Sequence, residues 1–187
     1  MRPNFIFIHS TGGYPDECWY LWLREEIEKL GCKVTVPRFP TPHGQSLDSW
    51  MKVFEPYFKQ IDENTILIGR SVGAPFILKI LERIDKPVKA VFLVAGFCSD
   101  LEIPEFVPLL NSFIDKPFDW EKIRINCKKF FVYHSDDDII VPLSYGKELA
   151  DKVGANLRVI KDGGHFNLST RFAERFDEIF EEIKKEL

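Results

Sequence analysis

The sequence contains no long hydrophobic run, and none of its stretches approaches the roughly 20 apolar residues that a membrane-spanning helix needs. It also has no strong charge of one sign, because 25 Lys and Arg residues oppose 29 Asp and Glu residues, for a net charge of −4. Such a chain offers no electrostatic attraction to nucleic acid or to an anionic membrane, so we expect neither as a partner. The apolar run near the start is too short for the core of a signal peptide, which favours a cytoplasmic protein.

Cysteine is scarce, and the sequence lacks the spacings that mark metal or redox sites. The four cysteines, Cys18, Cys32, Cys98 and Cys127, lie far apart and form no C-x-x-C pair, so neither a metal site nor a disulfide framework is indicated. A G-x-G-x-x-G motif is also missing after the first apolar segment, which argues against a dinucleotide site. We therefore expect no cofactor and no metal.

The chain does contain a regular alternation of short apolar and longer amphipathic segments, and its 187 residues suit one domain over 1–187. Alternation of this kind predicts a three-layer α/β/α sandwich around a parallel sheet of about six strands. The expected strands are 4–10, 33–39, 65–69, 89–96, 128–135 and 156–162, and the expected helices are 18–30, 46–58, 72–83, 142–153 and 166–187. Ser46 or Asp48 is the expected N-cap of the second helix. The long connection 97–120 is predicted to be a lid.

The segment "TILIGRSVGAP", residues 65–75, places a serine between two glycines directly after an apolar strand. Gly69, Ser71 and Gly73 have the G-x-S-x-G spacing of a nucleophile elbow, in which a sharp strand-to-helix turn exposes the serine hydroxyl. A Cβ atom two residues to either side of the serine would clash across such a turn. Ser71 is therefore our candidate nucleophile.

A serine hydroxyl needs a base, and the base needs a carboxylate to orient it. His165 in "KDGGHFN" follows the sixth expected strand and is the candidate base. Asp138 in "HSDDDIIVP" follows the fifth expected strand and is the preferred acid, with Asp136 and Asp137 as alternatives. Asp100, after the fourth strand, is a further alternative. The order serine, aspartate, histidine is that of the α/β-hydrolases.

An oxyanion hole should complete such a site with two backbone N–H donors. The amide of Val72, which follows the nucleophile at the start of a helix, is the first expected donor. The second should come from "HSTGG" after the first strand, where we favour the amide of Thr11 and then Gly12.

Substrate contacts are less sharply indicated by the sequence. Gly12, His43 and Phe97, together with aromatic residues of the 97–120 lid, are the candidates for lining the pocket. His43 lies in a proline-flanked loop and either borders the pocket or is simply exposed. His9 is expected to brace its loop without taking part in the chemistry.

Several segments together resemble the α/β-hydrolases, and more narrowly the small serine hydrolases of the RBBP9/YdeN family. The resemblance lies in "FIFIHSTGG", "PRFPTPHGQSLDSW", "GRSVGA", "SDDDIIVP" and "DGGHF", which span nearly the whole chain. It implies a compact form of the fold without the two leading strands of larger relatives, and a strand order of 2-1-3-4-5-6. The chain departs from the usual pattern at Ser10, where a glycine is common, and at Arg70 within the elbow.

The sequence thus predicts a serine hydrolase of the carboxylesterase type, in which Ser71 forms an acyl-enzyme with a small ester that has an apolar acyl part. A thioester or amide substrate remains open, as does an aminopeptidase or amidase with the same three residues. A non-catalytic protein-binding module on a hydrolase fold is the other alternative, because a fold does not fix a function. A small-molecule substrate is the expected partner, a protein partner is left open, and the chain is expected to be a monomer or dimer.

Overall fold

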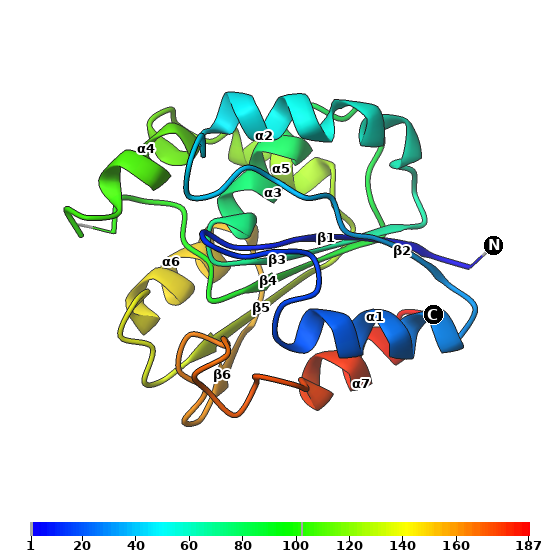
Figure 1. Ribbon diagram of the computed structural model, residues 1–187. Helices are drawn as coiled ribbons and strands as arrows, with labels where there is room; N and C mark the ends of the chain where they lie inside the picture. The colour runs from blue at the N-terminus through cyan, green and yellow to red at the C-terminus, as the bar shows by residue number, and fades with distance from the viewer. Residues whose placement is uncertain (1, 102) are drawn as a thin grey trace.

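A computed structural model describes residues 2–101 and 103–187 and contains one parallel β-sheet (Figure 1). Over these residues six strands pair in the order β2-β1-β3-β4-β5-β6, and every pairing is parallel. The predicted order is confirmed. The strands are β1 (Asn4–Ile8), β2 (Lys33–Thr35), β3 (Thr65–Arg70), β4 (Ala90–Val94), β5 (Phe130–Ser135) and β6 (Leu157–Ile160).

Helices cover both faces of the sheet and produce the expected three layers (Figure 1). Helices α1 (Trp19–Lys29) and α7 (Asp177–Lys185) pack on one face. The other face carries α2 (Leu47–Phe54), the 3₁₀ helix η1 (Glu55–Gln60), α3 (Gly73–Leu81), α4 (Val107–Ile114), α5 (Trp120–Ile125) and α6 (Leu143–Val153). Each face therefore has its own hydrophobic core.

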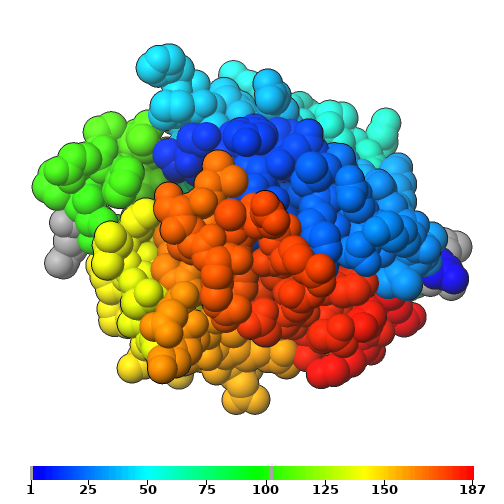
Figure 2. All heavy atoms as spheres, turned by 60° about the horizontal axis from the view of Figure 1, so that its bottom comes forward, coloured from blue at the N-terminus to red at the C-terminus, as the bar shows by residue number. Residues whose placement is uncertain are grey.

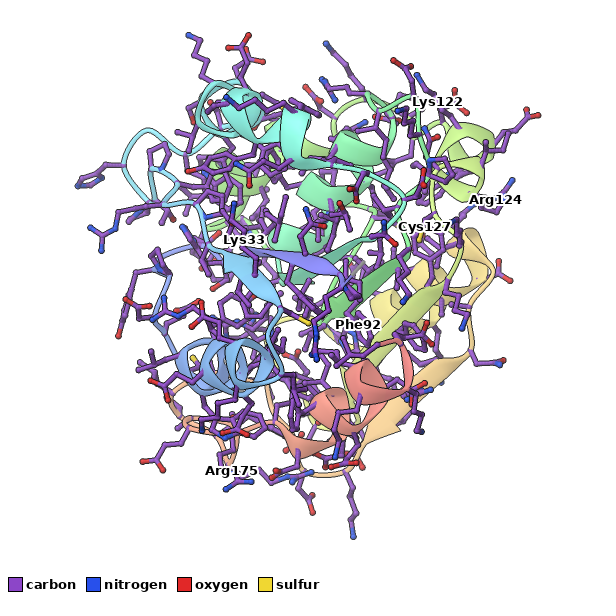
Figure 3. The ribbon with its side chains drawn as sticks, turned by 90° about the vertical axis from the view of Figure 1, so that its right-hand side faces the viewer. Lys33, Phe92, Lys122, Arg124, Cys127 and Arg175 are labelled. Carbon is purple, nitrogen blue, oxygen red and sulfur yellow. The ribbon has the colours of Figure 1, made fainter. Side chains whose placement is uncertain are left out.

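The central strands β3 and β4 are buried along their whole length, which explains their nearly continuous apolar sequences. Figure 3 shows Lys33 on the edge strand β2 and Phe92 of β4 in the interior. Phe92 stacks on Phe131 of β5 with ring centroids 4.5 Å apart, on the side that α7 covers. This rigid centre holds the carboxyl ends of the strands, where ligands bind in such sheets.

The expected helix over 166–187 is wrong in its first half, because α7 begins only at Asp177. Phe166 has a φ of 50°, in the left-handed region that a right-handed helix cannot contain. Turns over 167–176 instead bury Phe172 and Phe176 together with Phe166 against α1 and the sheet. The burial of three phenylalanines at irregular spacing overrides helical periodicity here.

The predicted lid, 97–120, contains a short helix, α4, which sequence analysis did not anticipate, and residue 102 lies outside the described residues. In Figure 2 this green segment lies at one side of the face where blue residues near 15 meet the orange segment near 165. Segments that are far apart in the sequence therefore meet at this edge.

Candidate active site

Ser71 lies in the sharp turn between β3 and α3 and has a φ of 53°, a conformation that costs a non-glycine residue about 1 kcal/mol or more. Its amide donates a hydrogen bond of 2.9 Å to the carbonyl of Val94 in the neighbouring strand. A Cβ on Gly69 would lie 2.7 Å from the carbonyl oxygen of Gly73, and a Cβ on Gly73 would lie 2.5 Å from that of Ile8. Both glycines are thus required by the turn and by its packing on β1.

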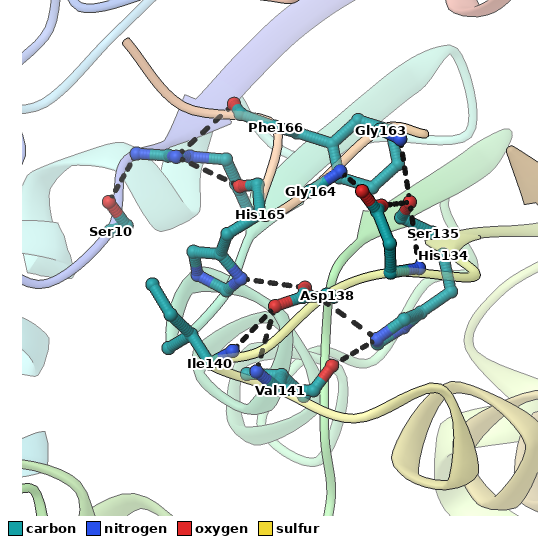
Figure 4. A network of polar contacts seen from close by, with 12 residues as sticks. Ser10, His134, Ser135, Asp138, Ile140, Val141, Gly163, Gly164, His165 and Phe166 are labelled. Atoms are coloured by element: carbon teal, nitrogen blue, oxygen red, sulfur yellow. Dashed lines mark hydrogen bonds and ion pairs between the residues drawn. The ribbon is translucent and has the colours of Figure 1, made fainter. Parts of the chain in front are cut away.

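His165 and Asp138 meet in the loops that follow β6 and β5 (Figure 4). Nδ1 of His165 lies 2.8 Å from Oδ2 of Asp138. The other carboxylate oxygen, Oδ1, accepts hydrogen bonds of 2.9 Å from the amides of Ile140 and Val141. A carboxylate held in this way fixes the ring with its proton on Nδ1 and leaves Nε2 of the neutral imidazole able to accept a proton.

A second histidine lies beside the same carboxylate. His134 is fully buried, and its Nε2 donates a 2.7 Å hydrogen bond to the carbonyl of Val141 while lying 3.8 Å from Oδ2 of Asp138. Burial lowers the pKa of His134, and the hydrogen bond to Val141 and the charge of Asp138 only partly offset this effect. The ring therefore stays neutral near pH 7 and acts as a fixed neighbour of Asp138.

The other candidate acids lie elsewhere. Asp137 accepts hydrogen bonds from the Ser135 hydroxyl and, at 2.7 Å, from the amide of Gly164, and these bonds lower the pKa of its carboxyl. Asp136 accepts from the amide of Asp162 at 2.9 Å. Both aspartates thus brace the loop that carries the histidine, whereas the side chain of Asp100 is exposed beside the lid.

A cavity of about 270 Å³ opens at Ser71 and His165, which both line it. Its apolar wall comes from the lid and from the loops after β5 and β6, through Leu101, Phe106, Leu110, Ile140, Val141 and Leu168. Its polar wall comes from the loop after β1 and from the histidine loop, through Ser10, Thr11, Gly12, Asn167 and Ser169. The cavity therefore has the polar and apolar sides that a small amphipathic molecule would need.

The two amides predicted to form an oxyanion hole flank this site. Val72 follows Ser71 immediately before α3, and Thr11 lines the cavity. Within the described residues, neither amide donates a hydrogen bond to another protein group. The amide of Gly12, by contrast, donates a 2.7 Å bond to Thr41 Oγ1, and Gln45 holds the Thr11 hydroxyl at 2.9 Å. Their role as oxyanion donors stays a prediction.

Two predicted pocket residues are placed away from the cavity. Phe97 is fully buried in the core beneath the lid, and His43 is exposed on its loop. Neither contributes to the cavity wall, which the lid builds with Leu101, Phe106 and Leu110 instead. His9 bridges two loops, with Nδ1 3.1 Å from the carbonyl of Ser10 and Nε2 accepting from the amide of Phe39 at 3.0 Å.

Sequence analysis missed a buried ion pair at the cavity wall. Arg70 and Glu17 are each more than nine-tenths buried and are joined by a 2.7 Å contact between Nη2 and Oε1. A signal for it existed, because an arginine at the end of a fully buried strand requires a counter-charge. The sequence did not reveal which acid supplies it, since Glu17 lies 53 residues away.

The described residues contain no helix long and apolar enough to cross a membrane. In the same two segments, 2–101 and 103–187, no three His, Cys, Asp or Glu side chains converge in a way that could hold a metal ion.

Comparison with known proteins decides the family. The family model described as "Serine hydrolase" matches residues 5–184. The chain belongs to the serine hydrolase family. It is 32% identical over 168 residues to the Bacillus subtilis (strain 168) hydrolase YdeN, a match that covers 89% of this chain and 87% of that protein.

Two further matches agree with this assignment. The serine hydrolase RBBP9 of Rattus norvegicus is 32% identical over 157 residues, which are 83% of this chain and 81% of the relative. The crystal structure of the ydeN gene product from B. subtilis superposes on this serine hydrolase with a TM-score of 0.91 and 28% identity, and the match covers 98% of each chain. The expected resemblance and the α/β-hydrolase fold are thus confirmed.

Proposed function

We propose that this serine hydrolase cleaves a small carboxylic ester through Ser71, His165 and Asp138. The observation that carries the proposal is that one cavity is lined both by a serine at a φ of 53° and by a histidine whose Nδ1 lies 2.8 Å from an aspartate oxygen. A hydrolytic triad uses these three residue types, with the carboxylate hydrogen-bonded to the histidine as it is here.

In the proposed reaction, Nε2 of His165 takes the Ser71 proton as Oγ attacks the ester carbonyl and the Oγ–carbon bond forms. The amides of Val72 and Thr11 would hold the oxyanion. His165 then gives its proton to the leaving alkoxide as the ester C–O bond breaks, which leaves an acyl-enzyme. Water, deprotonated by the same histidine, adds to the acyl carbon. Collapse of that second intermediate breaks the Oγ–carbon bond, frees the acid and returns the proton to Ser71.

The cavity favours a short acyl group. Ligand pockets typically enclose about 300–1,000 Å³, and the 270 Å³ here lies just below that range. Its apolar wall suits a hydrocarbon acyl part. A long acyl chain would extend beyond this cavity.

A series of p-nitrophenyl esters from acetate to decanoate, assayed beside aminoacyl p-nitroanilides, tests the proposal. We expect kcat/KM to be highest for the shorter acyl groups and to fall toward decanoate, because the cavity lies at the small end of the usual range. Faster hydrolysis of the anilides than of every ester would instead favour the amidase alternative. No turnover of any compound would favour the protein-binding alternative.

A further inference from the structure

We propose that Arg70 is a positioning residue that holds the loop of the catalytic histidine against the loop after β1, with Glu17 as its fixed counter-charge. The inference rests on the proposed function, because it assigns to Arg70 the alignment of His165 with Ser71. Arg70 is the last residue of the fully buried strand β3 and directly precedes Ser71, so its side chain starts next to the candidate nucleophile.

One end of the guanidinium binds the loop after β1. Nη2 of Arg70 donates to Ser10 Oγ at 2.6 Å and to Glu17 Oε1 at 2.7 Å. Ser10 Oγ in turn donates to the same Glu17 oxygen at 3.1 Å. The Ser10 hydroxyl therefore joins the two charged groups.

The other end binds the histidine loop. Nη1 of Arg70 donates to the backbone carbonyls of His165 and Phe166, at 3.3 and 3.2 Å. Trp19 Nε1 also donates to the Phe166 carbonyl, at 3.1 Å. Figure 4 shows Ser10, His165 and Phe166 gathered around this point, beside the contact between His165 and Asp138.

The segment held in this way is strained. Phe166, directly after the histidine, has a φ of 50°, in the left-handed region that bulky L-residues rarely adopt. Such a conformation persists only when its surroundings fix it. Hydrogen bonds from two side chains to the Phe166 carbonyl provide that constraint and so set the direction from which the His165 ring enters the cavity.

Stability alone does not account for the pair. Replacing a buried ion pair by apolar residues of similar volume is often neutral or stabilising. The planar guanidinium, however, presents N–H groups in a fixed fork that serves two loops at once, which a single ammonium cannot do in the same geometry. Substitutions can therefore separate the charge balance between Arg70 and Glu17 from the positioning of the histidine loop.

The decisive variant combines Arg70→Met with Glu17→Met, which removes both charges and leaves no unpaired buried ion. We would follow inactivation by a fluorophosphonate probe and separate the maximal rate, kinact, from the binding constant, KI. We expect kinact to fall about ten- to hundredfold, since misplacement by 1 Å can cost about a hundredfold, and KI to change by less than kinact although both side chains line the cavity. Amide hydrogen exchange over 163–169 should accelerate in the folded variant.

Two further variants serve as controls. Arg70→Lys keeps the charge but loses the fork, and we expect a kinact between those of wild type and the double variant. Arg158 forms an ion pair with Glu182 at the same distance of 2.7 Å, and neither residue lines the cavity. The substitution Arg158→Met breaks that pair and should leave kinact unchanged. A double variant with wild-type kinact, or with an altered KI alone, overturns the proposal.

Failure of the proposed function would be recognised separately. If wild-type protein does not react with the probe, the hydrolase mechanism fails, and hydrogen exchange alone then decides the inference. Faster exchange over 163–169 in folded Arg70→Lys supports positioning of the loop by Arg70, and unchanged exchange there overturns it.

Discussion

Asp138 accepts hydrogen bonds on both carboxylate oxygens, from two backbone amides on Oδ1 and from His165 on Oδ2. At the scale of the residue this explains how one of three consecutive aspartates becomes the partner of the histidine. The backbone of the loop turns Asp138 inward. Asp136 and Asp137 remain exposed and accept hydrogen bonds from backbone amides of the histidine loop. The sequence favoured Asp138 and left Asp136 and Asp137 as alternatives, because the direction of each side chain depends on turn geometry that the sequence pattern does not encode.

Asparagine substitutions in the triplet test this distinction. We expect Asp138→Asn to lower kcat about 10⁴-fold, as loss of the orienting carboxylate favours the wrong histidine tautomer. Asp136→Asn and Asp137→Asn serve as matched controls and should stay within about tenfold of wild type, since each only braces the loop. A loss at Asp137→Asn equal to that at Asp138→Asn would refute the assignment.

At the scale of the element, most of the strands and helices follow from periodicity. The central strands β3 and β4 were predicted correctly, because burial on both faces of the sheet makes their sequences almost continuously apolar. The predicted helix was wrong over 166–176, because Phe166 is left-handed and the turns after it bury Phe172 and Phe176 without forming a helix. The helix α4 was missed because the prolines of 97–120 are typical of an irregular segment, whereas Pro108 lies in the first turn of α4, where proline is tolerated.

The cap of α2 gives an element-scale test. The Ser46 hydroxyl accepts from the amide of Ser49 at 3.1 Å, and the Ser49 hydroxyl accepts from that of Ser46, while the exposed Asp48 lies in the first turn. Of the two caps that the sequence allowed, the structure uses Ser46. We expect Ser46→Ala to lower the free energy of unfolding by about 1 kcal/mol, and Asp48→Ala by only about 0.3–1 kcal/mol through the helix dipole. Urea denaturation measures both, and a larger loss at Asp48→Ala would contradict the capping geometry.

At the scale of the whole molecule, two neutral histidines are enclosed by the fold. Burial lowers the pKa of both His9 and His134. In the unfolded chain both would titrate near the usual value of about 6.5. Below about pH 6.5 the two histidines take up protons in the unfolded chain but stay neutral in the folded chain. Their contribution to the free energy of unfolding is therefore fully present above about pH 6.5 and is lost as the pH falls further.

We therefore expect the free energy of unfolding to fall between pH 7 and pH 5, by at most about 1.4 kcal/mol per pH unit for each histidine. Urea denaturation of wild type, His9→Gln and His134→Gln at several pH values measures the slope. Each substitution should make it shallower, whereas His43→Gln is the control, because folding does not remove that exposed ring from water. A wild-type slope in both buried variants would contradict this account.

The most direct test of the central claim is fluorophosphonate labelling of the purified protein, read by intact mass. In this reaction Ser71 Oγ bonds to phosphorus, fluoride leaves, and the serine proton passes to His165. We expect one adduct on wild type, none on Ser71→Ala, and labelling slowed by about 10³-fold or more on His165→Ala. An unlabelled but folded wild-type protein, or an adduct that persists on Ser71→Ala, would contradict the assignment of Ser71 as the nucleophile.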